Sequence, residues 1–145
     1  IWRDIGFYFS LRGGYEEAFH DNRTGNRDVI PLIKQFALGG IGSLRGYQEL
    51  EFSKPQTIAM NRNLSYINYR TQINLPVTGN FQFGLFVDAA NLIIDDSSLA
   101  GMRYGTGFGF HYLTPLGAVN FDLGFKIDPA PGVDKYVSHF SLGVI

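Results

Sequence analysis

Hydrophobic and polar side chains alternate along most of this chain of 145 residues. Between Ile5 and Glu17 most odd-numbered positions are large and apolar, namely Ile5, Phe7, Phe9, Leu11 and Tyr15. The positions between them are mainly polar or small. A period of two is the spacing of a β-strand, in which successive side chains point to opposite faces. This stretch is therefore predicted to be a strand with one apolar and one polar face.

The same alternation returns over five further segments, residues 64–75, 81–94, 103–112, 119–127 and 137–145. The connections between these strands are in turn long, short, long, short and long. They are residues 18–63, the turn 76–80, the polar loop that begins at Asp95, the turn 114–117 and the loop 129–136. Soluble antiparallel sheets also alternate, but no soluble sandwich requires this regular change of length. Bacterial outer-membrane barrels do have short periplasmic turns and long external loops.

The fold class predicted from this pattern is all-β, a transmembrane antiparallel β-barrel with about six strands in this chain. Residues 18–63 form a long extracellular loop in this prediction, and the last strand ends on the periplasmic side. Barrels of this class have at least eight strands, and an open edge in lipid leaves backbone groups unpaired. The chain is therefore expected to be part of a larger barrel, with the missing strands in the same chain or in a partner chain.

The composition supports a membrane-spanning sheet. Charged residues make up 17% of the chain, below the ~25% usual in soluble domains, whereas aromatic residues reach 15% and glycines number 18. No apolar run approaches the ~18 residues of a membrane helix, so any membrane span must consist of strands. The formal net charge is −1 and the basic residues are scattered, which argues against a nucleic-acid partner.

One stretch without strand alternation, residues 36–47, is rich in glycine and carries a single arginine, Arg45. The glycines permit tight bends and close approach of the backbone, and they are Gly39, Gly40, Gly42 and Gly46. The guanidinium of Arg45 offers five donors in a rigid fork that suits carboxylates. These residues, hereafter the signature loop, predict a compact loop that places an arginine against an acidic group.

The signature loop resembles that of the BamA/TamA superfamily of outer-membrane assembly barrels. Its core tetrad is Leu44, Arg45, Gly46 and Tyr47, and the preceding glycine pair is Gly39 and Gly40. The resemblance implies that residues 1–145 are the C-terminal part of one sixteen-stranded barrel, preceded by its N-terminal strands and periplasmic POTRA modules. It implies a bacterial outer-membrane protein whose long loop, residues 18–63, folds into the lumen.

The resemblance also assigns partners to the loop arginine, which in the family pairs with acidic residues on the two strands after the loop. Asp88 matches one of these acids, and the alternation independently puts it on the polar face. Gln72 stands where the family has a glutamate. Arg45 is therefore expected to have one carboxylate and one neutral acceptor.

The last predicted strand has a separate expected role, because it closes the barrel against the first strand. In the family this seam is the proposed lateral gate, at which client strands pair with exposed backbone edges. The residues expected at the seam are Phe140, Leu142 and Gly143. The alternative is a static barrel in which this strand is merely the last one.

The function expected from the resemblance is insertion and folding of client outer-membrane proteins, with the lipid bilayer, the unfolded clients and periplasmic accessory proteins as partners. The alternatives are a two-partner-secretion transporter that exports an unfolded exoprotein, and a passive pore. No catalytic residue, metal site or cofactor is expected, so the protein is not expected to be an enzyme. His20, His111 and His139 have no metal-like spacing.

Two expectations concern the inner wall of the barrel. The glycines at Gly105, Gly107 and Gly109 recur at strand spacing with no helix signal after them, so they are expected to let the wall pass close to the folded loop. Asp122 and Lys126 share the polar face of one strand and are expected to pair there.

Overall fold

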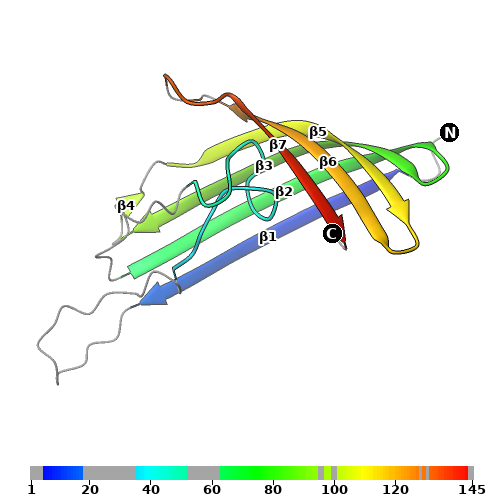
Figure 1. Cartoon of the computed structure of the whole chain (residues 1–145). Coiled ribbons are helices and arrows are strands. Elements are labelled where there is room, and N and C mark those ends of the chain that lie inside the picture. Colours follow the sequence, from blue (N-terminus) through cyan, green and yellow to red (C-terminus); the bar gives the residue numbers. More distant parts are fainter. Residues whose placement is uncertain are drawn as a thin grey trace, which may run out of the picture.

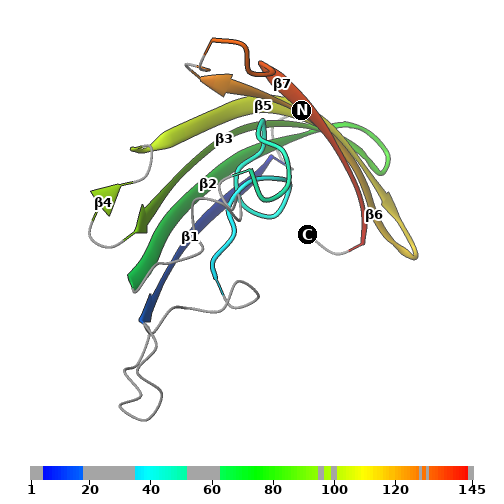
Figure 2. The same ribbon diagram turned by 60° about the vertical axis from the view of Figure 1, so that its left-hand side comes forward.

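The computed structural model describes residues 5–17, 35–51, 63–94, 97–98, 101–127, 129 and 131–143. These residues form one curved antiparallel sheet, with the signature loop lying against its concave side (Figures 1 and 2). The strands are β1 (Gly6–Glu17), β2 (Asn63–Thr78), β3 (Phe81–Ile94), β4 (Ser97–Ser98), β5 (Arg103–Thr114), β6 (Gly117–Ile127) and β7 (Tyr136–Gly143). Their order is β1-β2-β3-β5-β6-β7, and the short β4 pairs with β3.

The register of the sheet aligns apolar residues across β1, β2, β3, β5 and β6. Phe7 pairs with Ile73, Ile73 with Leu85, Leu85 with Phe108 and Phe108 with Leu123. Residues directly opposite each other on neighbouring strands share a face, so these positions form one apolar row. The alternation seen in each segment of the sequence therefore adds up to one apolar face and one polar face for the whole sheet.

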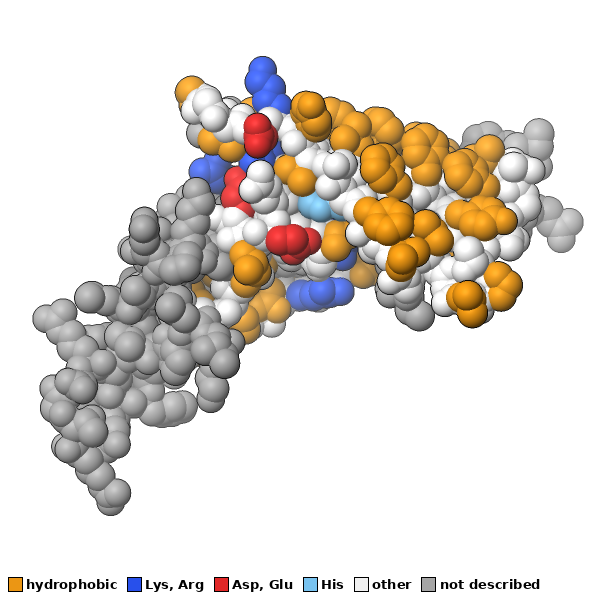
Figure 3. All heavy atoms as spheres, viewed as in Figure 1, with side chains coloured by type: hydrophobic (Ala, Val, Ile, Leu, Met, Phe, Trp, Pro, Cys, Tyr) orange, Lys and Arg blue, Asp and Glu red, His pale blue; other side chains and the backbone are white. Residues whose placement is uncertain are grey.

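The exposed outer face of this sheet is apolar. Its strands expose large hydrophobic side chains, among them Phe7, Phe9, Leu11, Leu85, Val87, Phe110, Phe121, Phe140 and Leu142. Figure 3 shows such side chains gathered over β5 to β7. The concave inner face instead buries polar side chains, which are Asn68, Arg70, Gln72, Asp88, His111, Asn120, Asp122, Lys126 and His139. Water-soluble proteins have the opposite distribution, whereas a barrel wall in lipid has this one.

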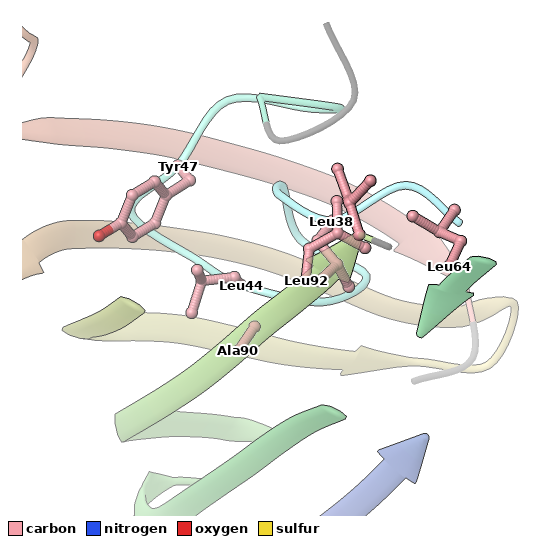
Figure 4. Close-up of a cluster of buried hydrophobic side chains, with 7 residues drawn as sticks. Leu38, Leu44, Tyr47, Leu64, Ala90 and Leu92 are labelled. Carbon is pink, nitrogen blue, oxygen red and sulfur yellow. The ribbon is translucent and has the colours of Figure 1, made fainter. Parts of the chain in front are cut away.

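A small apolar cluster holds the signature loop at the end of the sheet where the long connections lie. Leu38, Leu44 and Tyr47 of the loop pack with residues of β2 and β3, namely Leu64, Ala90, Leu92 and Ile94 (Figure 4). Leu44 and Leu64 are completely buried. Full burial of a leucine side chain contributes about 1.5 to 3 kcal/mol, so this cluster stabilises the loop against the inner face.

Two predicted connections are partly wrong. Residues 76–78 belong to β2 instead of a turn, with a shift of register between Pro76 and Thr78. An irregular position in the ladder tolerates proline, which has no amide hydrogen to donate. Ser97 and Ser98 pair with Ile94 and Ile93 instead of lying in a loop.

The remaining boundaries agree closely with the alternation, except that the last strand begins at Tyr136 and is described to Gly143. Of the predicted long loop 18–63, residues 18–34 and 52–62 lie outside the described residues, and so does His20. No helix within the described ranges is long and apolar enough to cross a membrane.

Candidate functional site

The signature loop is a tight turn with Arg45 near its tip. The Gly40 amide donates to the Tyr47 carbonyl at 3.1 Å, and the Leu44 amide donates to the Gly40 carbonyl at 3.0 Å. The φ angles of Gly39, Gly40 and Gly46 are 118°, 84° and 94°, a range that residues with a Cβ rarely adopt. The glycines of the tetrad and of the preceding pair are therefore required by the shape of the turn.

The barrel wall has glycines where the loop backbone approaches it. A Cβ atom at Gly105 would collide with the Arg45 carbonyl oxygen, and one at Gly124 would collide with the Gly46 amide nitrogen. The expectation that the glycines of β5 admit the loop is thus confirmed for Gly105. Gly107 and Gly109 instead face groups of the wall itself, the Leu123 carbonyl and the Asp122 carboxylate.

Arg45 makes a bidentate ion pair with Asp88 of β3. Its Nε donates to Asp88 Oδ2 at 2.7 Å and its Nη2 donates to Oδ1 at 2.8 Å, while the Arg45 amide donates to Oδ2 at 3.2 Å. The guanidinium carbon lies 3.6 Å from the centre of the Phe86 ring. Arg45 and Asp88 are 1% and 0% exposed, so both charges have been removed from solvent.

Gln72 of β2 supplies the neutral acceptor that the sequence suggested. Arg45 Nη1 donates to Gln72 Oε1 at 2.5 Å, and Gln72 Nε2 donates to Asn74 Oδ1 at 2.7 Å. The second bond fixes the orientation of the amide, so its oxygen faces the guanidinium. The structure therefore brings together Arg45, Asp88 and Gln72, three residues from different parts of the chain.

The expectation that Arg45 has one carboxylate is wrong, because Asp122 of β6 provides a second. Arg45 Nη1 lies 3.3 Å from Asp122 Oδ2, and Asp122 Oδ1 lies 3.0 Å from His111 Nε2. The expected pair between Asp122 and Lys126 is also wrong, since Lys126 Nζ donates to Glu51 Oε1 at 2.8 Å. Four residues along a strand span about 13 Å, which separates the two side chains beyond contact.

Besides Arg12, whose Nη1 donates to the Gly42 carbonyl at 3.2 Å, sequence reasoning missed three residues that bind the backbone of the loop. Asn68 Nδ2 donates to the Ser43 carbonyl at 2.8 Å, Arg70 Nη1 donates to the Gly42 carbonyl at 3.4 Å, and His139 Nε2 accepts the Gly46 amide at 3.3 Å. The alternation put all three on the polar face. It contained no information about which of them the loop would meet.

The predicted seam residues lie in β7, at one edge of the sheet. Phe140 and Leu142 are 62% and 71% exposed on the outer face, and Gly143 has a φ angle of 125°. Among the described residues β7 pairs with β6 alone, from Tyr136 to Gly143. Its other edge therefore has no strand partner within the described part of the chain.

Polar space remains beside the arginine cluster. A cavity of about 270 Å³ lies between the loop and the wall, and its polar lining includes Arg12, Arg70, His111, Asn120 and Ser141. The described ranges contain no group of three or more acidic or histidine side chains arranged to hold a metal ion.

A curved sheet with an apolar outer face, a buried polar inner face and a loop held inside it by an arginine defines the wall of a transmembrane β-barrel. The chain belongs to the Omp85 superfamily, whose domain model matches residues 2–144. This membership confirms the predicted fold class and makes the sheet part of an outer-membrane barrel. The number of strands in the complete barrel and the sides of the membrane that the loops face stay predictions.

Two curated relatives are similar to this chain. The outer membrane protein assembly factor BamA of Nitratidesulfovibrio vulgaris is 24% identical over 143 residues, which cover 92% of this chain and 17% of that protein. The chloroplastic outer envelope protein 39 of Arabidopsis thaliana is 29% identical over 105 residues, 66% of this chain and 26% of that protein. The chain thus spans about a quarter or less of either relative. No solved structure matches it.

Proposed function

We propose that the protein containing this chain inserts and folds client β-barrel proteins in a bacterial outer membrane. The observation that carries this proposal is the buried cluster of Arg45, Asp88, Asp122 and Gln72, which fastens the signature loop inside a barrel wall of the Omp85 superfamily. The similarity to an outer membrane protein assembly factor supports it.

The proposed work of the arginine cluster is to hold the loop in one place within the lumen. The ion pair with Asp88 anchors the loop to β3, Gln72 anchors it to β2 and Asp122 anchors it to β6. A buried bidentate pair has a fixed geometry that an exposed pair lacks. The loop then acts as a rigid internal support for the strands that lead to the last strand.

The proposed work of β7 is to offer its free edge to a client strand. Within the described part of the chain this edge presents unpaired amide and carbonyl groups, and in lipid each such group costs several kcal/mol until it is paired. A client segment that adds to this edge gains those hydrogen bonds, as in other cases of strand addition. The proposal needs no nucleophile, cofactor or nucleotide, so the protein is not an enzyme in this account.

A secretion transporter is the second candidate, and the cavity beside the loop favours it. Its lining residues extend from Tyr8 of β1 to Gly143 of β7. In this account an unfolded exoprotein would pass through the lumen beside the loop, as a small solute would in a passive pore. Whether the protein is an assembly factor, a secretion transporter or a passive pore, its long loops are proposed to face the outside. The C-terminus is proposed to face the periplasm, where accessory proteins would bind.

The test is reconstitution of the full-length protein in lipid vesicles, with an unfolded outer-membrane barrel and an unfolded exoprotein offered separately. Folding is measured by resistance of the client to protease and to heat in detergent. We expect the client barrel to fold faster than in empty vesicles. Arg45→Lys should reduce this acceleration, because lysine keeps the charge but loses the bidentate fork.

The matched control is Asp134→Asn, which changes an exposed charge in the turn before β7. It should leave the acceleration intact. Transport of the exoprotein into the vesicles without client folding would replace the assembly function with secretion. Passage of small solutes alone would identify a passive pore.

A further inference from the structure

The tip of the signature loop is hydrogen bonded to the last strand through the side chain of His139. The Gly46 amide donates to His139 Nε2 at 3.3 Å, although the two residues are 93 positions apart. His139 lies on the inner face of β7 and is 7% exposed. An imidazole nitrogen that accepts an amide hydrogen must itself be unprotonated, so the ring proton of this tautomer lies on Nδ1.

Gly46 is fixed in position by the wall on which it lies. A Cβ atom at Gly46 would be 3.0 Å from both the carbonyl carbon and the carbonyl oxygen of Phe125. The backbone nitrogen of Gly46 lies over Gly124. The preceding residue, Arg45, is held by Asp88 and Asp122. The amide that reaches His139 therefore belongs to a part of the loop that the wall and two carboxylates hold in place.

Within the described part of the chain, the strand that carries His139 has β6 as its one strand partner. It pairs with β6 over eight residues, and Asn120 Nδ2 adds a side-chain bond to Ser141 Oγ at 3.2 Å. Asp122 stands directly opposite His139 in the register of β6 and β7. Two residues that bind the loop are thus neighbours on the inner face. They are Asp122, which binds the Arg45 guanidinium, and His139, which accepts the Gly46 amide.

We propose that His139 is a positioning residue that couples the seating of Arg45 to the position of the last strand. While Arg45 is bound to Asp88, the Gly46 amide holds β7 against the loop. When the loop leaves its site, β7 loses this bond and its ladder with β6 opens more often. The link is a property of the barrel, and only its effect on client folding rests on the proposed function.

The test is hydrogen exchange of the β7 amides in the full-length protein in lipid, because exchange reports the free energy of local opening. Asp88→Asn weakens the ion pair that holds the signature loop against the wall, and it changes no residue of β7. We expect it to raise exchange across Val137–Leu142 by roughly five- to tenfold, the effect of losing one hydrogen bond. In a His139→Leu background the strand is already uncoupled, so Asp88→Asn should cause no further increase there.

Two further variants separate coupling from ordinary strand stability. His139→Gln keeps an acceptor oxygen near the position of Nε2, and it should restore the response to Asp88→Asn. Ser141→Ala is the matched control, since it removes the side-chain bond to Asn120 on the same face but does not touch the loop. In this background Asp88→Asn should raise exchange by the same factor as in the wild type.

The coupling would be overturned if Asp88→Asn raised the exchange of the β7 amides equally in the wild type and in the His139→Leu background. It would also be overturned if Asp88→Asn did not raise exchange in the wild type. If His139→Leu does not fold, His139→Asn replaces it, because the shorter amide does not reach Gly46. Client folding is measured on the same samples. If hydrogen exchange shows no coupling but client proteins fold normally, only this inference is rejected. If exchange is coupled but client proteins do not fold, only the proposed function is rejected.

Discussion

At the scale of single residues, the main feature is a buried arginine whose charge is balanced by two carboxylates. Asp88 accepts three hydrogen bonds from Arg45, and Asp122 lies 3.3 Å from the same guanidinium. Removing one partner from a buried ion pair leaves the other charge without compensation. The cluster is therefore more sensitive to substitution than an exposed ion pair, which contributes about 0 to 1 kcal/mol.

Asp88→Asn is expected to destabilise the folded barrel by about 3 kcal/mol, the low end of the range for a broken buried pair, because Asp122 still faces Arg45. The measurement is the urea dependence of unfolding of the full-length protein from lipid vesicles. Asp134→Asn is the control and should change stability by less than about 0.5 kcal/mol, as surface substitutions usually do. Equal stability of the two variants would show that the ion pair does not hold the fold.

Gly124→Ala tests the close approach of the loop to the wall. The added methyl group would lie 2.7 Å from Gly46 Cα and 2.8 Å from the Arg45 carbonyl carbon, so the loop must move away from β6. The loop is expected to become sensitive to protease in the intact barrel. Gly42→Ala is the control within the loop itself, because a Cβ there meets no atom within 4 Å. Equal protease resistance of both variants would contradict the close packing of the signature loop against β6.

At the scale of the elements, each strand separates an apolar outer row from a polar inner row. In β3, Leu85 and Val87 are 46% and 52% exposed, whereas Phe86 and Asp88 are buried. On a soluble sheet the exposed row would tolerate charge. On a barrel wall it faces hydrocarbon, where a charged side chain is costly.

Val87→Arg is therefore expected to destabilise the barrel by about 2 to 4 kcal/mol in vesicles, the cost of an arginine near the middle of the membrane. Leu116→Arg is the control, because Leu116 is 99% exposed in the short turn between β5 and β6. It should cost about 0 to 1 kcal/mol, as at the membrane interface. Unfolding from vesicles at increasing urea concentration measures both. A neutral Val87→Arg variant would contradict contact of this face with lipid.

At the scale of the whole molecule, the described sheet is an open wall with two edges. Within the described ranges β1 pairs with β2 alone and β7 with β6 alone. A wall of this kind cannot stand in lipid without partners for its edges, because the unpaired backbone groups have no water to bind. Strands from the remainder of the barrel would satisfy both edges.

The chain of 145 residues expressed by itself is therefore expected to associate through its edges when it is refolded in detergent micelles. The measurement is the molar mass of the refolded chain by light scattering during size-exclusion chromatography. Species with two or more chains are expected. A folded monomer with the β-content of the sheet would show that the edges need no partner.

The sequence alone determined the strands, their faces and the loop. Alternation is a local property with a period of two residues, so it identified the six long strands of the described sheet and put Asp88, Asn68 and His139 on the polar face. The glycines around Arg45 identified a tight turn because their backbone freedom is also local. The resemblance then named Asp88 and Gln72 as partners of the arginine.

Only the tertiary structure decided which polar residues the loop meets. Asp122 and His139 are 77 and 93 positions from their loop partners, and no periodicity links residues at such distances. Their contacts depend on the register of β5, β6 and β7 and on the curvature that brings these strands over the loop. The expected pair of Asp122 with Lys126 was wrong for the same reason. Sharing a face is set by local geometry, whereas contact is set by the path of the whole chain.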